Sequence, residues 1–202
     1  MSMPKKVKRP SFVTVEEFLN LHKGSLKMKL LGDEAGMARK ISEPTVNRPG
    51  LALSGFFTYF AYKRVQVIGN SELSFLETLE PSARAERFRL LCQQDIPCIV
   101  VARSHKLPPE LITIANESGI AVLQTSMVTM KFINAATIKL EFLFAPTLLV
   151  HGCLVDVRGI GVLVQGESGT GKSESVIGLL QRGASLVADD AVRLRLIEDR
   201  EI

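Results

Sequence analysis

An eight-residue motif constrains the fold of this chain more than any other feature. Residues 166–173 read Gly-Glu-Ser-Gly-Thr-Gly-Lys-Ser and match the pattern G-x-x-x-x-G-K-[ST] in full. The glycines let the backbone curl until several N–H groups converge on one phosphate, and the positive end of the following helix points at the same anion. Because this geometry needs a strand before the loop and a helix after it, the motif predicts an α/β fold, with a strand at 160–165 and a helix at 172–182.

The candidate phosphate-binding residues are the eight of this loop: Gly166, Glu167, Ser168, Gly169, Thr170, Gly171, Lys172 and Ser173. Lys172 supplies a compact charge for the β- and γ-phosphates of a nucleoside triphosphate, and Ser173 offers a hydroxyl oxygen to Mg²⁺. The alternative is a merely flexible loop, which does not explain why Lys-Ser opens a helix at this point. The motif therefore predicts a nucleotide site with Mg²⁺.

Two neighbouring carboxylates end the next expected strand, Leu186–Ala188. At the carboxyl end of that strand, Asp189 and Asp190 could hold Mg²⁺, orient a nucleophile or accept its proton. The same pair is equally typical of a turn or a helix cap. His151 lies in an apolar segment and, taken alone, is typical of a buried structural histidine.

The preceding part of the chain alternates strands and helices, which is typical of a three-layer α/β domain with a mostly parallel sheet. We expect strands at 26–31, 64–68, 97–102 and 120–124, and helices at 15–22, 72–79, 81–92, 109–118 and 126–144. Thr14 and Glu17 are spaced as a capping box, and Ser71 is placed to cap the helix that follows it. The proline-containing segment 43–50 is expected to be a loop.

The sequence becomes rich in Leu and Val after Ala145-Pro146, so we expect one domain at 1–145 and the start of a P-loop domain at 146–202. Segments 147–157 and 160–165 predict an antiparallel hairpin whose second strand runs into the glycine-rich loop. A last strand is expected at 192–197. No catalytic constellation is evident in residues 1–145, and packing, assembly or regulation is the role expected for them.

Composition excludes several classes of protein. No apolar run reaches the roughly 18 residues that span a bilayer, so no membrane segment is expected. The net charge of +4 comes from residues 1–50, where ten basic side chains face five acidic ones, whereas residues 51–202 carry fifteen and sixteen. With no Trp and two Tyr, no stacking platform for nucleic acid is expected. Three cysteines, Cys92, Cys98 and Cys153, fit free core thiols in a reducing cytoplasm.

The combination of motifs resembles the HPr kinase/phosphorylase family, which are bacterial protein kinases unrelated to the eukaryotic kinase fold. The resemblance covers nearly the whole chain and rests on these segments: Arg48–Phe56, Arg64–Gly69 with Glu72, His151-Gly152, Gly161–Leu163, Gly166–Glu174, Arg182-Gly183 and Leu186–Asp190. It implies that residues 146–202 begin a P-loop kinase domain of the phosphoenolpyruvate-carboxykinase-like kind.

The resemblance also implies an activity and roles for residues. Family members use ATP and Mg²⁺ to phosphorylate a seryl hydroxyl of the phosphocarrier HPr, and they reverse this by phosphorolysis, which consumes phosphate and yields pyrophosphate. Asp190 would take the serine proton and return it in the reverse direction, Asp189 would support Asp190, and His151 would lie close to the phosphates. Ser173 would ligate Mg²⁺. Family members assemble as hexamers, so a cytoplasmic homo-oligomer that regulates carbon metabolism is expected.

The sequence departs from the family pattern at two places. Ala184 stands where the family usually has histidine after Arg-Gly. The chain also ends at Ile202, before the region where the family places a further acidic Mg²⁺ ligand, an active-site arginine and the helices that grip HPr. We therefore expect a fragment or a natural short homologue. Two alternatives stay open, a non-catalytic nucleotide-binding or regulatory homologue and another P-loop enzyme such as a small-molecule kinase.

Overall fold

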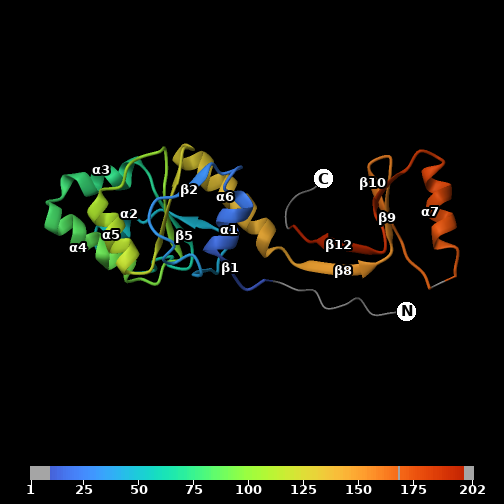
Figure 1. Cartoon of the computed structure of the whole chain (residues 1–202), viewed down its shortest axis with the longest axis horizontal. Coiled ribbons are helices and arrows are strands. Elements are labelled where there is room, and N and C mark those ends of the chain that lie inside the picture. Colours follow the sequence, from blue (N-terminus) through green and yellow to red (C-terminus); the bar gives the residue numbers. More distant parts are fainter. Residues whose placement is uncertain (1–9, 168, 198–202) are drawn as a thin grey trace. The chain divides into compact units, whose positions relative to one another are not determined.

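The computed structural model describes residues 10–167 and 169–197 (Figure 1). The described chain divides into two compact units, Pro10–Phe144 and the residues from Ala145 onward. None of the described helices is long and apolar enough to cross a membrane.

The first unit is built on a five-stranded sheet in the order β2-β7-β6-β5-β4. Its strands are β2 (Met28–Leu30), β4 (Val46–Asn47), β5 (Val65–Ile68), β6 (Cys98–Val101) and β7 (Ala121–Thr125). Strands β4 to β7 run parallel, and β2 pairs antiparallel with β7. Every residue of β5, β6 and β7 is buried, because helices cover both faces of a parallel sheet and favour continuous apolar strands.

Helices cover the two faces of this sheet as separate layers (Figure 1). They are α1 (Val15–His22), α2 (Gly50–Leu53), α3 (Asn70–Thr78), α4 (Pro81–Cys92), α5 (Pro109–Glu117) and α6 (Thr129–Phe144). Side chains alternate across each strand, so Cys98 and Val100 join the core under α1 and α6, whereas Ile99 and Val101 join the core under α2 to α5. The predicted three-layer α/β fold is confirmed.

Two helix starts show how far local signals reach. The capping box at α1 is confirmed, since Thr14 Oγ1 accepts from the Glu17 amide at 3.1 Å and Glu17 Oε2 accepts from the Thr14 amide at 2.9 Å. The prediction of Ser71 as a cap is wrong, because α3 begins at Asn70 and Gly69 precedes it. The Gly69 amide donates instead to Glu72 Oε2 at 2.9 Å.

Other boundaries differ from the expected ones by a few residues. Helix α6 begins at Thr129, and the expected loop at 43–50 contains the two-residue strand β4. That strand is created by pairing with β5, a contact that the proline-containing sequence does not reveal. A small antiparallel ribbon of β1 (Val13–Thr14) and β3 (Lys40–Ile41) lies outside the main sheet.

The described residues of the second unit form two antiparallel sheets and one helix. Its elements are β8 (Thr147–His151), β9 (Cys153–Val157), β10 (Ile160–Val164), α7 (Lys172–Leu180), β11 (Ser185–Ala188) and β12 (Ala191–Arg195). One sheet has the order β10-β9-β11, and the other pairs β12 with β8. The predicted hairpin is present between β9 and β10, with Arg158 and Gly159 in its turn at φ +54° and +87°. Its expected first strand is divided at Gly152, which has φ +156°.

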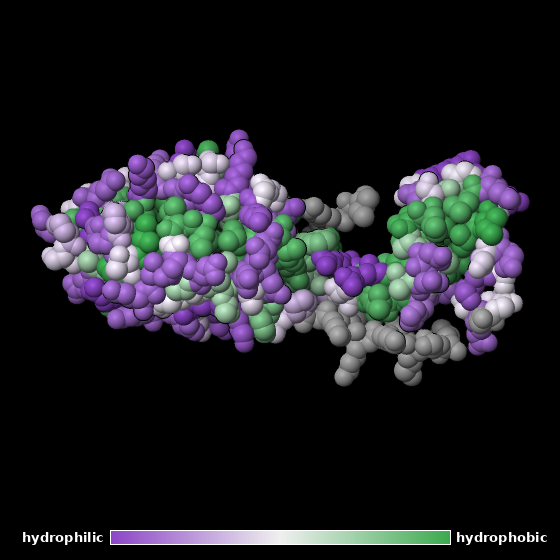
Figure 2. All heavy atoms as spheres, viewed as in Figure 1, coloured by the Kyte–Doolittle hydropathy of each residue, from purple (hydrophilic) through white to green (hydrophobic). Residues whose placement is uncertain are grey.

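Few side chains of the second unit are buried. Val155, Val176 and Val192 are its buried branched side chains among the described residues. Large apolar side chains remain exposed on β10 and β11, including Ile160 at 68% and Val187 at 58%. Figure 2 shows hydrophobic surface gathered over β9 and β10, whereas hydrophilic side chains cover most of the visible face of the first unit.

Candidate active site

The P-loop follows β10 and leads directly into α7. Gly169 and Gly171 have φ +81° and +82°, values that L side chains rarely adopt, so glycine is required for this curl. Gly171 immediately precedes Lys172, the first residue of α7. The loop therefore ends directly at the N-terminus of α7, as the motif predicts. Ser168, a predicted phosphate contact, lies outside the described residues.

The carbonyl oxygen of Glu167 organises the loop internally. It accepts a hydrogen bond from Thr170 Oγ1 at 2.8 Å and another from Nζ of Lys172. Gly166 approaches this turn closely, because a Cβ on it would lie 2.8 Å from Thr170 Oγ1 and 3.4 Å from Lys172 Cγ. The Lys172 side chain thus bends back over the loop, which places its ammonium group where an anion can attract it. Ser173, which carries a hydroxyl group, is exposed in the first turn of α7.

His151 is the last residue of β8 and pairs with Ala191 of β12. Its Nδ1 lies 3.3 Å from the carbonyl oxygen of Asp190, a contact in which a protonated Nδ1 donates. The prediction of a buried structural histidine is wrong, because His151 is exposed. It stands at the end of a two-stranded ribbon that leaves it uncovered, a feature that an apolar sequence pattern does not report.

Asp189 and Asp190 form the link between β11 and β12. Asp189 Oδ1 accepts from the Asp190 amide at 2.9 Å, and the Asp189 carbonyl accepts from Ala191 N at 2.7 Å. Asp190 has φ +62°, a left-handed conformation that aspartate tolerates better than most residues. The turn is therefore real, and it also leaves both carboxylates exposed at the edge of the site.

Cys153 was expected to be a core thiol, but it is only partly buried and lies at the site. Its thiol donates to Asp189 Oδ1 at 2.7 Å, across the pairing of β9 with β11. This hydrogen bond, the desolvation of the thiol and the two aspartate charges raise the pKa of Cys153 above its usual value. The thiol therefore stays protonated near neutral pH and acts as a donor that holds Asp189. The sequence signal that could have found it is its place directly after His151-Gly152.

One short segment joins the carboxylates to the P-loop. The Gly152 amide donates to the Asp190 carbonyl at 3.2 Å, and Gln165 Nε2 donates to the His151 carbonyl at 3.0 Å. Gly152 also packs tightly on the end of β10, since a Cβ on it would lie 2.7 Å from the Val164 carbonyl oxygen. The structure therefore brings His151, Asp189 and Asp190 together beside the residue that enters the loop.

The residues of this site suit a nucleotide phosphate with Mg²⁺. Because Gly166 has no side chain, the curled loop keeps room that a Cβ would fill. The loop and the first turn of α7 also carry a lysine and an exposed hydroxyl group. Among the described residues no group of three or more His, Cys, Asp or Glu side chains is placed to hold a metal. Mg²⁺ fits such a site, because it usually keeps several waters and binds through one or two carboxylates and the phosphates themselves.

Comparison with known proteins gives matches along almost the whole chain. The family model "HPr Serine kinase N terminus" matches residues 13–140, and "HPr Serine kinase C-terminal domain" matches residues 143–202. Proteins named HPr kinase/phosphorylase from Bacillus cereus (strain B4264) and Bacillus anthracis are each 43% identical over 169 residues, which is 84% of this chain and 55% of theirs. The chain thus spans about half the length of these relatives.

A solved structure is also similar to part of the chain. It contains the CBS and DRTGG domains of the regulatory region of Clostridium perfringens pyrophosphatase, complexed with the activator diadenosine tetraphosphate. The TM-score is 0.45 at 14% identity, and the match covers 61% of this chain and 47% of that one.

Proposed function

Since the chain belongs to the HPr kinase/phosphorylase family, we propose that it carries the nucleotide-binding part of an ATP-dependent protein kinase acting on a seryl residue of HPr. In the forward reaction the γ-phosphoryl group of ATP passes to the seryl oxygen, the hydroxyl proton leaves and ADP is released. In the reverse reaction inorganic phosphate takes the phosphoryl group from phosphoserine, which yields pyrophosphate and the free hydroxyl. Through HPr the enzyme regulates carbon metabolism.

The observation that carries this proposal is the double contact of His151-Gly152. His151 Nδ1 and the Gly152 amide contact the Asp190 carbonyl oxygen. The His151 carbonyl oxygen accepts a hydrogen bond from the side chain of Gln165, the residue before the P-loop. A phosphoryl transfer needs a proton acceptor beside the bound phosphates, because catalysis rests on positioning and charge stabilisation. The contact fixes an aspartate turn to the start of a phosphate loop.

Binding and charge stabilisation fall to the loop. The backbone N–H groups of residues 166–171 and the N-terminal end of α7 would cradle the phosphates. Lys172 would exchange its bond to the Glu167 carbonyl for the β- and γ-phosphates, and Ser173 would give its hydroxyl oxygen to Mg²⁺. When bound, Mg²⁺ supplies charge neutralisation on the phosphate oxygens.

We assign the role of acceptor for the seryl proton to Asp190. Its carboxylate is exposed at the end of the turn, whereas Oδ1 of Asp189 is engaged by the Asp190 amide and by Cys153. Asp190 would accept the seryl proton in the kinase direction and return it in phosphorolysis. Asp189 would hold the turn, and His151 would lie next to the phosphates. We further propose a cytoplasmic homo-oligomer, a hexamer as in the family, with the domain of residues 1–145 serving assembly or regulation.

Because the chain spans about half the length of its relatives, the direct test joins it to the C-terminal region of a full-length relative and mixes that protein with HPr, Mg²⁺ and ATP labelled in the γ-phosphoryl group. Label on a serine of HPr, released as pyrophosphate when phosphate is added, is the expected result. Binding of ATP without transfer to HPr would replace the kinase proposal by a non-catalytic nucleotide-binding role. Transfer to a small molecule in place of HPr would assign another P-loop kinase activity.

A further inference from the structure

The two parts of the candidate active site belong to different sheets of the second unit. The P-loop follows β10 of the sheet β10-β9-β11, whereas His151 ends β8 of the two-stranded ribbon β12-β8 (Figure 1). Asp190 stands directly before β12. Because phosphoryl transfer depends on placing a proton acceptor beside the bound phosphates, a contact that fixes one sheet against the other bears on the reaction.

Gln165 makes such a contact with its side chain. It follows Val164, the last residue of β10, and its Nε2 donates to the His151 carbonyl oxygen at 3.0 Å. Since His151 belongs to β8, this hydrogen bond crosses from one sheet to the other. The residue that precedes the phosphate loop is thereby tied to the strand end that carries the histidine.

Gly152 makes room for this contact. Val164 pairs with Cys153, so Gln165 continues its strand beside Gly152. A Cβ on Gly152 would lie 3.1 Å from Gln165 Cγ and 2.7 Å from the Val164 carbonyl oxygen. The stem of Gln165 therefore packs against the space that a side chain at position 152 would need, and its amide group reaches the His151 carbonyl.

The same segment carries the contact on to Asp190. The Gly152 amide donates to the Asp190 carbonyl at 3.2 Å, and His151 Nδ1 lies 3.3 Å from that oxygen. His151 also pairs with Ala191, the next residue along the chain. A displacement at Gln165 is therefore passed through two bonded residues to the backbone of Asp190. Because Asp190 has φ +62°, the direction of its carboxylate follows from a turn that these bonds hold.

The bond of Gln165 supplies geometry more than stability. Its side chain is exposed, and a single exposed hydrogen bond contributes little to the stability of a fold. A misplacement of about 1 Å in an active site, in contrast, can lower the rate of a reaction about a hundredfold. A role for Gln165 is therefore expected to be visible in the rate of transfer.

We propose that Gln165 is a positioning residue for phosphoryl transfer, which holds the Asp190 turn in a fixed place relative to the phosphates on the P-loop. The inference rests on the proposed kinase function, because it assigns Gln165 a part in that reaction. Gln165 acts through His151 and Gly152. Through the same bond, nucleotide binding at the loop changes the surroundings of His151.

Gln165→Met tests this role, because methionine keeps the length of the side chain and its packing on Gly152 but cannot donate a hydrogen bond. The chain is again joined to the C-terminal region of a full-length relative. We expect kcat for transfer to HPr to fall about tenfold, and KM for ATP with Mg²⁺ to change by less than about twofold. Gln181→Met is the matched control, since it makes the same substitution at an exposed residue beyond the far end of α7. It should leave both constants unchanged.

A second readout needs no transfer. The 202-residue chain has three histidines, and His22 and His105 lie in the first unit, so ¹⁵N-labelled histidine gives signals of His151 with two internal references. ATP with Mg²⁺ should shift the His151 signals in the unsubstituted chain and in Gln181→Met. In Gln165→Met we expect ATP to bind and the His151 shift to shrink by about half or more, because the bond that transmits the change is absent.

Three results would overturn the proposal: an unchanged kcat in Gln165→Met, an equal loss in Gln181→Met, or a His151 shift of full size in Gln165→Met. A rise in KM that accounts for the whole loss would overturn it as well, since Gln165 would then act in binding. If the unsubstituted joined protein does not label HPr, the kinase proposal fails, and the His151 shift alone decides whether Gln165 couples the two sheets.

Discussion

The thiol of Cys153 donates to Oδ1 of Asp189, which also accepts the amide of Asp190. Because this contact raises the pKa of Cys153, we expect slow reaction with a thiol reagent such as dithionitrobenzoate at pH 8. Asp189→Asn removes the carboxylate charge and should lower that pKa, so the reaction should become faster. Burial raises the pKa of Cys92 and Cys98 to about 12, so Cys153 should be the thiol that reacts in the folded chain. Unchanged kinetics in Asp189→Asn would contradict this assignment.

A side chain at Gly166 is excluded by steric contact alone, because the backbone of Gly166 is not left-handed. Gly166→Ala places a methyl group 2.8 Å from Thr170 Oγ1, which must break its bond to the Glu167 carbonyl. We expect the affinity for ATP with Mg²⁺, measured by calorimetry, to fall by about tenfold, or 1.4 kcal/mol. Gly161→Ala is the control, since its methyl group would lie at an ordinary 3.7 Å from Leu154 Cδ1. Equal affinities of the two variants would show that the loop opens without cost.

Glu72 joins the start of α3 to the segment before α2. Its carboxylate, 4% exposed, accepts from Gly69 N and from the Arg48 guanidinium at 3.0 and 2.9 Å. Glu72→Ala leaves the guanidinium and the amide without their partner, so we expect a loss of about 3 kcal/mol in the free energy of unfolding, measured in urea. Ser71→Ala, at the exposed neighbour that the sequence suggested as a cap, should change it by less than about 0.5 kcal/mol. The opposite ranking would restore Ser71 as the cap.

His22 gives a prediction for pH. Burial and the charge of Lys139 lower the pKa of His22 below 6.5, and its Nε2 is buried with no hydrogen-bond partner among the described residues. The unfolded state therefore binds more protons once the pH falls below 6.5, so the stability is full above that pH and is lost as the pH falls through the lower folded pKa. Urea midpoints at successive pH values should show this loss, and His22→Phe, which keeps the edge contact with Phe18, should reduce it. An identical pH dependence in the variant would assign the loss to other groups.

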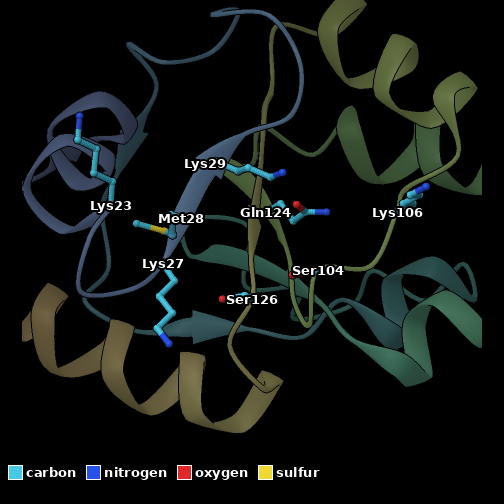
Figure 3. A pocket seen from close by; sticks show the side chains of 8 residues that line it. All are labelled: Lys23, Lys27, Met28, Lys29, Ser104, Lys106, Gln124 and Ser126. Carbon is cyan, nitrogen blue, oxygen red and sulfur yellow. The ribbon is translucent and has the colours of Figure 1, made fainter.

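Local patterns predicted those parts whose cause is local. The P-loop is defined by glycine conformations and one helix start, and the parallel sheet by apolar runs that tolerate burial on both faces. The pairing of Cys153 with Asp189 joins residues 36 positions apart and depends on the register of β9 and β11, which no local pattern encodes. The exposure of His151 likewise depends on tertiary structure, because β8 pairs with β12 in a two-stranded ribbon that leaves His151 exposed. A pocket of the first unit is lined by residues from Lys23 to Ser126 (Figure 3), so it becomes visible only once β2 is placed beside β7.

The role of Asp190 has the sharpest test because its backbone limits which substitution is informative. At φ +62°, alanine would strain the turn, whereas asparagine tolerates this conformation and removes only the charge and the basicity. Asp190→Asn should therefore bind ATP as the unsubstituted chain does and, in the chain joined to the C-terminal region of a full-length relative, lower phosphoryl transfer to HPr by about two to four orders of magnitude. Lys172→Ala should weaken both binding and transfer, since its charge serves the phosphates in both states. Transfer at an unchanged rate by Asp190→Asn would exclude Asp190 as the base and direct attention to Asp189, whose Oδ1 is already engaged by Cys153 and the Asp190 amide.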